Sequence, residues 1–454
     1  MRFRGSWGAA PWFGLIKQAN IRQPNHTTRT NGMAQPAGWG IVRAPMPPRP
    51  TLMTDPDRQT LLINLAHTFT HYSLLILPTA VLAMARPGGA FGDAYGPILA
   101  LATGMFVLYG LFSLPQGWLA ERIGRKALMA AFFLGTGASM IACGMARTPG
   151  MLALALCGIG LFTAIYHPIG TALLVETAGD KPGRAIGLNG VFGNVGVALA
   201  PVVTAFMAAE AGWQAAFFLP GMLCLFLGLF WLRMPAIEGH RNASARPFPA
   251  IPRHLVRRAV TVLLLIATVS GLVFNAFTLL LPKLMQERLA SDPSLLPLIG
   301  SAAFVATLCG AVTQFSVGRV IDRHTLRRVL IPVSMILCPA LALLSFVDGW
   351  AVVPLAGAVA ASLFGQVTVN ETMAARYISP EMRTKIYSIR FFVGFLGAAA
   401  AAPLVGFLHT QTGNLMTATA LLAAFSVVTL ACALWFPDRE EELHPERWAI
   451  APAE

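Results

Sequence analysis

The sequence predicts an all-α membrane protein in which twelve transmembrane helices form two pseudo-symmetric six-helix bundles. Of the 454 residues, 56% are hydrophobic and only 12% are charged, whereas soluble domains carry about 25% charged residues. Apolar runs long enough to cross about 30 Å of hydrocarbon recur twelve times along the chain. Short motifs of the first half return in the second half. This composition excludes a soluble enzyme, a disordered protein and a coiled coil.

Residues 1–58 precede the first apolar run and are expected to form a disordered tail, because they are rich in Pro, Arg and Asn and lack periodicity. They also lack the apolar core of a signal peptide. Met53 stands directly before Thr54-Asp55-Pro56 and the first span, so we expect the native product to start at Met53 or at another internal Met. An intact mass that includes Met1 would contradict this expectation.

The twelve predicted spans divide six and six around a polar break. They cover residues 60–85, 94–116, 127–146, 151–175, 184–209, 212–233, 259–283, 295–317, 328–347, 351–375, 384–409 and 414–436. The predicted domains are therefore an N-terminal bundle over 59–233, a central loop over 234–258, a C-terminal bundle over 259–437 and a tail over 438–454.

The distribution of basic residues predicts the orientation. A net charge of +13 would indicate nucleic-acid binding in a soluble protein. Here Lys and Arg concentrate in the loops after even-numbered spans, whereas the odd-numbered loops hold only Arg86, Arg147, Lys283 and Arg288. The positive-inside rule then places both termini and the central loop in the cytoplasm. No nucleic-acid partner is expected.

The two halves repeat each other at an offset of 201 residues. The matching pairs are Gly117 and Gly318, Glu121 and Asp322, Arg122 and Arg323, Gly193 and Gly394, and Gly196 and Gly397. A shared offset at two separated sites indicates duplication. Two parallel six-helix repeats predict a transporter whose site lies near the midplane between them.

The loop after span 2 reads Gly117-Trp-Leu-Ala-Glu121-Arg122-Ile-Gly124-Arg125-Lys126. It resembles the signature loop of the major facilitator superfamily, G-x-L-A-D-R-x-G-R-K/R, with Glu121 in place of Asp. The copy at Gly318, Asp322 and Arg323 is looser. The resemblance covers about residues 59–437 and implies the facilitator fold, a monomer and a bacterial inner-membrane location. It also implies that these residues, with Glu176 as a partner, close a cytoplasmic gate; a basic turn that serves only topology is the alternative.

Small residues in span 5 resemble the antiporter motif of facilitator-family drug exporters, G-x8-G-x3-G-P-x2-G-G. Gly187, Gly196, Ala200 and Pro201 follow its spacing, although Ala replaces the third Gly and the final Gly pair is absent. The resemblance implies export. Close packing of a Gly-rich helix that is bent by Pro is the alternative.

Three histidines lie inside predicted spans. Tyr166-His167-Pro168 in span 4 and His67-x-x-x-His71 in span 1 resemble the fosmidomycin-resistance-like branch of the superfamily. His67 and His71 share a helix face with Asn64, and that face should point into the bundle because lipid offers no polar partner. Histidines titrate near physiological pH, so these three are candidate proton carriers; polar helix contacts are the alternative. We expect no zinc site, because the His pair lacks an adjacent Glu and a third ligand.

Further polar side chains inside spans complete the candidate pathway for substrate and protons. They are Asn189, Asn194, Asn275, Gln314, Gln366, Asn370, Glu371 and Arg390. Glu371 and Arg390 are the only strongly charged ones well inside spans, and burying either alone costs several kcal/mol. We expect them to pair, or Arg390 to face the cavity and attract an anionic substrate.

The sequence lacks the G-x-x-x-x-G-K-S/T phosphate loop, so the chain carries no ATP-driven motor of this type. No His-x-x-x-His pair is joined to an acid and further ligands, so we expect no enzyme and no cofactor. The resemblance to the facilitator superfamily implies a secondary active transporter that works by alternating access. The favoured activity is proton-coupled export of a small organic molecule. Proton-linked uptake of a small metabolite, anionic if Arg390 serves the substrate, is the second reading. Exchange without protons and a non-transporting membrane sensor are the others.

Overall fold

The computed structural model describes residues 54–177, 182–236, 248–289 and 293–448. The chain divides into two units, Met1–Leu52 and Met53–Glu454, and every described element belongs to the second unit. Within the described residues, twelve helical segments are long and apolar enough to cross a membrane. The predicted all-α architecture with twelve spans is confirmed.

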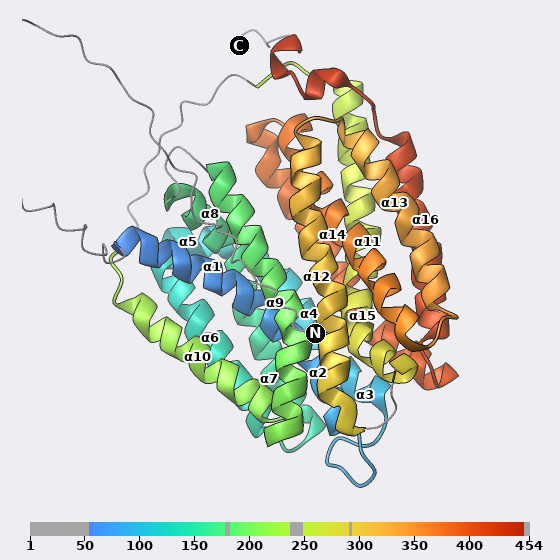
Figure 1. Ribbon diagram of the computed structural model, residues 1–454. Helices are drawn as coiled ribbons and strands as arrows, with labels where there is room; N and C mark the ends of the chain where they lie inside the picture. Colours follow the sequence, from blue (N-terminus) through green and yellow to red (C-terminus); the bar gives the residue numbers. More distant parts are fainter. Residues whose placement is uncertain (1–53, 178–181, 237–247, 290–292, 449–454) are drawn as a thin grey trace, which may run out of the picture. The chain divides into compact units, whose positions relative to one another are not determined.

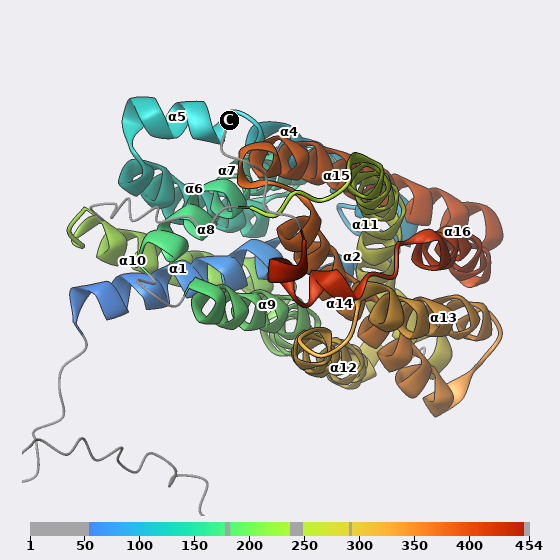
Figure 2. The ribbon, with the colours of Figure 1, turned by 90° about the horizontal axis from the view of Figure 1, so that it is seen from above.

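The helices of the first half account for spans 1 to 6, and those of the second half for spans 7 to 12 (Figures 1 and 2). The first half contains α1 (Asp55–Leu74), α2 (Leu77–Met84), α3 (Tyr95–Ala100), α4 (Thr103–Ser113), α5 (Gln116–Ile123), α6 (Arg125–Met145), α7 (Pro149–Thr163), α8 (Tyr166–Thr177), α9 (Pro182–Ala211) and α10 (Ala215–Leu232). The second half contains α11 (Arg253–Leu289), α12 (Leu296–Ile321), α13 (Leu326–Leu344), α14 (Val352–Tyr377), α15 (Pro380–Thr412) and α16 (Met416–Trp435), with short 3-10 turns η1 (Pro293–Leu295), η2 (Gly349–Ala351), η3 (Glu440–Glu442) and η4 (Pro445–Arg447).

Several helix ends extend into segments that hydropathy assigned to tails and loops. α1 begins at Asp55, inside the predicted 1–58 tail, because Thr54 and Asp57 form a capping box and Pro56 between them favours the first helical turn. α11 begins at Arg253, inside the predicted 234–258 loop. Polar first turns carry no hydropathy signal, so apolar runs underestimate helix length. Residues 1–53, with the proposed start at Met53, lie outside the described residues.

Spans 1, 2 and 4 each consist of two helical pieces. The break between α1 and α2 precedes Pro78, and the break between α7 and α8 precedes Pro168. Proline lacks an N–H group and clashes with the carbonyl four residues earlier, which interrupts the helix. His167 therefore lies in the first turn of α8, directly after such a break.

The repeated glycines mark equivalent helix crossings in the two halves. A Cβ atom at Gly196 of α9 would collide with the backbone of Thr68 in α1. In the second half, Gly397 of α15 lies equally close to the backbone of Gly271 and Leu272 in α11. The glycines at the shared offset thus allow the same close approach of spans 1 and 5, and of spans 7 and 11.

The end of this unit that carries α5 and residues 318–328 is called the signature-loop end. The end that carries residues 85–94 and 412–415 is called the opposite end. At the opposite end the two halves meet closely, because Gly96 lies against Gly406 and Gly300 lies against the backbone of Pro201 and Val202. Figures 1 and 2 show α9 of the first half beside α12 of the second.

A buried carboxylate anchors the C-terminal segment 437–448 to the second half, together with ion pairs of Arg328 to Asp438 and Glu440. Glu442 is 1% exposed and accepts hydrogen bonds from the Tyr377 hydroxyl, at 2.7 Å, and from the backbone N–H of Leu326. The Arg376 guanidinium lies 3.5 Å away. Burial raises the pKa of the Glu442 carboxyl above its ordinary value.

This raised pKa predicts a pH-dependent anchor. A carboxyl whose pKa is higher in the docked segment than in the undocked one stabilises docking fully at pH values below its ordinary pKa of about 4.3. This stabilisation is lost as the pH rises through the raised pKa. Protease cleavage within 437–448 should therefore become faster as pH increases across this window. Glu442→Gln should make the cleavage rate independent of pH over the same range; a wild-type rate that does not change with pH would contradict the assignment.

Candidate functional site

Three imidazoles from spans 1 and 4 form a cluster, here called the histidine cluster: His67 and His71 of α1 and His167 of α8. Their ring centroids lie 5.0 Å apart for His67 and His71, 5.2 Å for His67 and His167, and 5.5 Å for His71 and His167. One ring nitrogen from each residue lies within 4.8 Å of the others. Each of the three residues is partly exposed.

A backbone carbonyl sets the orientation of His67. Its Nδ1 lies 2.7 Å from the carbonyl oxygen of Asn189. A carbonyl only accepts hydrogen bonds, so Nδ1 carries the hydrogen and Nε2 of the neutral ring carries a lone pair. That Nε2 lies 3.2 Å from Nε2 of His71. The lone pair of His67 therefore points into the histidine cluster, where it can accept a proton.

Buried polar groups hold this carbonyl and ring in place. The Asn189 side chain donates to Oδ1 of Asn64, at 2.8 Å, and to the hydroxyl of Tyr166, at 2.7 Å. The Tyr166 ring stacks on His67 with centroids 4.9 Å apart. Because both asparagines are buried, these bonds are protected from water and fix the face that Asn64 shares with His67.

Gly193 of α9 provides the space that the His67 ring occupies, since a Cβ at this position would overlap the imidazole. Gly193→Ala should therefore displace His67 and reduce transport about 10-fold, because small misplacements of a reacting group have large effects on rate. Gly187→Ala is the matched control, since a Cβ there meets open space; it should leave transport unchanged. Flux measurements in liposomes on both variants test this, and equal effects would contradict it.

Aromatic side chains of both halves face the histidine cluster. The ring of His167 lies 5.8 Å from Phe391 of α15 and 6.4 Å from Tyr109 of α4. Phe395, one helical turn after Phe391, lies 4.4 Å from Tyr109. The site thus lies between the halves. No sequence pattern distinguishes these aromatic residues, since such side chains are common in apolar spans.

An ion pair lies beside this aromatic wall. Nη1 of Arg390 is 2.6 Å from Oε1 of Glu371, and its guanidinium carbon lies 5.6 Å from the Phe391 ring centroid. The Arg390 side chain is 12% exposed and that of Glu371 is 46% exposed. The structure therefore shows the pairing that the sequence offered as one alternative, with the carboxylate on the more open side.

The polar residues of α11 and α14 form hydrogen bonds within the second half. Ser270 donates to Oε1 of Gln366 at 2.8 Å, whereas the Asn275 amide bonds back to the carbonyl of Gly271 in its own helix at 2.7 Å. Nε2 of Gln366 and Oδ1 of Asn370 are buried without a hydrogen-bond partner among the residues described. Each such atom costs about 1–3 kcal/mol, so both are available to a polar ligand.

The helix-packing residues of α9 serve contacts both within and between the halves. Asn194 donates a hydrogen bond to the Gln314 side chain of α12, across the two halves. Ala200 is buried, and the carbonyl of Pro201 lies against Gly300 of α12. Gly187, by contrast, is exposed.

The predicted gate residues lie at the signature-loop end. Gly117, Glu121, Arg122, Arg125, Asp322 and Arg323 are exposed, whereas Lys126 and Gly318 are partly exposed. The Arg122 guanidinium stacks over Trp118 of its own helix at 4.0 Å. The side chain of Glu176 lies outside the described residues, so its expected gate contact has no structural description. The predicted gate residues therefore lie mostly on a solvent-exposed surface.

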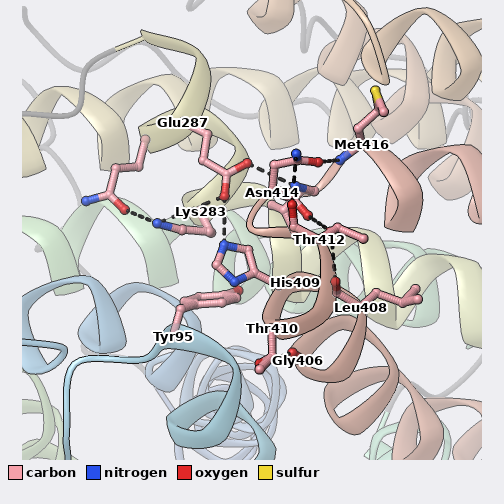
Figure 3. Close-up of polar contacts among 12 residues, drawn as sticks. Tyr95, Lys283, Glu287, Gly406, Leu408, His409, Thr410, Thr412, Asn414 and Met416 are labelled. Carbon is pink, nitrogen blue, oxygen red and sulfur yellow. Dashed lines mark hydrogen bonds and ion pairs between the residues drawn. The ribbon is translucent and has the colours of Figure 1, made fainter.

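At the opposite end, a polar network links α11, α15 and α3 (Figure 3). Nε2 of His409 lies 2.9 Å from Oε1 of Glu287, and the other oxygen of Glu287 accepts from the backbone N–H of Leu415 at 3.1 Å. Tyr95, from the first half, lies 5.0 Å from the His409 ring and 5.6 Å from Nζ of Lys283. These contacts connect the two halves at this end.

Glu287→Ala should loosen the opposite end, because it removes the acceptor of both His409 and Leu415. We expect faster hydrogen–deuterium exchange in α3 and in the last turns of α15. Asp348→Ala is the control, because Asp348 pairs with Arg288 while 73% exposed, and exposed pairs contribute about 0–1 kcal/mol. Equal hydrogen–deuterium exchange in Glu287→Ala and Asp348→Ala would contradict the view that Glu287 holds the two halves together at the opposite end.

Comparison with known proteins agrees with this architecture. The family model "Major Facilitator Superfamily" matches residues 63–307 and 263–450. The chain is 24% identical to a probable L-galactonate transporter of Escherichia coli, over 41% of this chain and 40% of that protein. It is 27% identical to a gallate transporter of Pseudomonas putida, over 40% of each. It is also 24% identical to a probable sugar efflux transporter of Helicobacter pylori, over 52% of this chain and 59% of that protein. The matches thus span about 40% to 59% of the length of these relatives.

Solved structures show the same fold. The inward-open xylose transporter XylE of E. coli matches with a TM-score of 0.65 and 11% identity, over 86% of this chain and 99% of that one. An inward-facing bacterial homologue of the human lysosomal transporter Spinster matches with a TM-score of 0.61 and 14% identity, over 85% and 95%. The fosmidomycin-resistance-like branch stays a prediction. The protein is a multi-pass membrane protein of a transporter family, not an enzyme, and its chain belongs to the Major Facilitator Superfamily.

Proposed function

We propose that the protein is a secondary active transporter that carries a small molecule by alternating access, with its site between the histidine cluster and α15. The observation that supports this proposal most strongly is the contact between the two halves at the histidine cluster. His67, His71 and His167 of the first half face Phe391 of the second half, with Arg390 beside it. A site made by both halves changes shape whenever the halves move relative to each other, as alternating access requires.

The contacts support a state that is closed at the opposite end. There the backbones of α3 and α15 touch at Gly96 and Gly406, whereas the signature-loop residues Glu121 and Asp322 are exposed. With the orientation that the positive-inside rule predicts, this is an inward-open state of a monomer in the bacterial inner membrane, with both termini in the cytoplasm.

Proton coupling is part of the proposal. Nε2 of His67 presents a lone pair toward the histidine cluster, and a neutral imidazole nitrogen can accept a proton there. Export is favoured by the partial antiporter motif, in which Gly196 packs against α1 and Pro201 against α12, and by the relative named as a probable sugar efflux transporter.

Uptake of an anionic metabolite is the second candidate. Arg390 lies beside the histidine cluster, and two relatives are named for L-galactonate and gallate transport. The direction of substrate movement relative to the proton flux separates the two candidates in one assay: antiport supports export, and symport supports uptake.

The test is substrate-dependent proton movement in proteoliposomes that contain a pH-sensitive dye. Small anions, sugars and antimicrobial compounds are screened with the wild type, His71→Gln and the control His324→Gln, whose exposed ring lies after α12 and bonds to the Val320 carbonyl. We expect flux with wild type and control and a loss in His71→Gln. Equal flux in all three would contradict proton carriage by the histidine cluster.

A further inference from the structure

The histidine cluster has the composition of a transition-metal site. The sequence argued against zinc because His67 and His71 lacked a third ligand, and the fold supplies one in His167. The three candidate nitrogens lie within 4.8 Å of one another, and the closest pair is 3.2 Å apart. Zn–N bonds of about 2.1 Å in a tetrahedral site place ligand nitrogens about 3.4 Å apart. Small side-chain rotations therefore suffice to form a three-histidine site.

The surroundings of His67 are those of a metal ligand. A ligating histidine commonly donates its other ring N–H to a carbonyl or carboxylate, which fixes its tautomer and orientation. His67 makes this contact with the Asn189 carbonyl at 2.7 Å, and Asn189 is held by Asn64 and Tyr166. The lone pair on Nε2 of His67, an atom that lies 3.2 Å from Nε2 of His71, is thereby directed into the histidine cluster.

The charges nearby determine in what form a metal would enter. The printed contacts of the three rings are with neutral groups, namely the Asn189 carbonyl and the rings of Tyr166, Tyr109 and Phe391, and the nearest charge acting on them is the Arg390 cation, which repels positive charge at His167. A dication with only neutral ligands in an environment of low dielectric constant is costly. An organic ligand with carboxylates would neutralise the metal, and one of these carboxylates would take the place of Glu371, which pairs with Arg390 beside Phe391 at 2.6 Å.

We infer that His67, His71 and His167 bind a divalent transition-metal ion as cargo, which enters as a complex with a small carboxylate chelator. The inference rests on the proposed transport function and names its substrate class. Imidazole nitrogen suits Zn²⁺, Cu²⁺, Ni²⁺ and Co²⁺. Atoms of the chelator occupy the remaining coordination positions of the metal. The chelator leaves together with the metal when the protein changes to its other conformation.

The test uses the purified full chain and Co²⁺, whose visible absorption reports coordination by nitrogen. Co²⁺ alone and Co²⁺ with citrate are titrated into wild type, His167→Gln, Arg390→Gln and the control His324→Gln. We expect one Co²⁺ per chain in wild type and control, and binding at least about 10-fold weaker in His167→Gln, as loss of a ligand or its support produces. Unchanged thermal unfolding shows that His167→Gln is folded.

The remaining outcomes separate the parts of the inference. Tighter binding with citrate that Arg390→Gln abolishes supports the chelate, whereas equal binding of Co²⁺ alone overturns the chelate and keeps the metal site. No Co²⁺ binding to folded wild type, or equal binding in His167→Gln, overturns the metal site. If proteoliposomes then transport a metal-free compound with proton flux, the proposed transport function is supported although the metal site is not. Metal binding without any transport of the metal would contradict the role of the metal as cargo.

Discussion

Replacing His67 with glutamine is expected to lower transport about 100-fold or more while the protein stays folded, since a positioned proton carrier contributes about this much to rate. Glutamine can still donate to the Asn189 carbonyl, so the contact at 2.7 Å has a substitute. It cannot take up a proton or present a ring nitrogen to His71. The loss is measured as initial flux in proteoliposomes at matched protein density.

Two controls define this result. His324→Gln removes a histidine that lies at the signature-loop end and bonds only to the Val320 carbonyl among its described contacts, so its flux should equal that of wild type. Thermal unfolding of His67→Gln should remain within a few degrees of the wild-type transition. Wild-type flux in folded His67→Gln would show that the histidine cluster is not on the transport path.

Arg390→Ala is expected to reduce transport about 30-fold, which corresponds to about 2 kcal/mol, the lower range for truncating one partner of a partly buried charge pair. The substitution leaves Glu371 without its ion-pair partner at 2.6 Å and removes the cation beside Phe391. Because Glu371 is 46% exposed, water can solvate it, and the cost in folding stability should stay near 1 kcal/mol or below. Flux and thermal unfolding measured on the same preparation separate these two effects.

The double variant Arg390→Ala with Glu371→Gln identifies what the arginine does. If Arg390 serves only to neutralise Glu371, removing both charges should restore most of the flux. If it contacts the substrate, flux stays low and the preference for anionic compounds disappears. Wild-type activity in Arg390→Ala would contradict both roles.

Much of the fold and part of the site could be predicted from the sequence, because the determining features are local. Twelve apolar runs predicted the spans, since hydrocarbon thickness fixes their length. The spacing of Asn64, His67 and His71 predicted one polar face, because it equals whole helical turns. The repeated Gly193-x-x-Gly196 pattern indicated a close helix crossing, which the structure shows to be that of α1 and α9. This pattern could also have indicated that α9 leaves space for a side chain of α1, which is the His67 ring.

The rest of the site depends on contacts between distant parts of the chain. His167 joins His67 only after α8 folds beside α1, and Phe391 reaches them from the other half. The network of Tyr95, Glu287 and His409 has no pattern in the sequence, because its members lie near three separate helix ends. Glu371 and Arg390 were selected because charge inside a span is rare, a signal that neutral aromatic residues do not provide.

The measurement that tests the central claim most directly is substrate-driven proton flux in proteoliposomes that contain wild type or His67→Gln, with small anions, sugars, antimicrobial compounds and Co²⁺–citrate as candidate substrates. A transport site at the histidine cluster predicts flux for wild type with at least one compound and a loss of about 100-fold in the variant. If wild type and His67→Gln show proton fluxes of equal size with each compound that is transported, the transport site lies elsewhere in the protein.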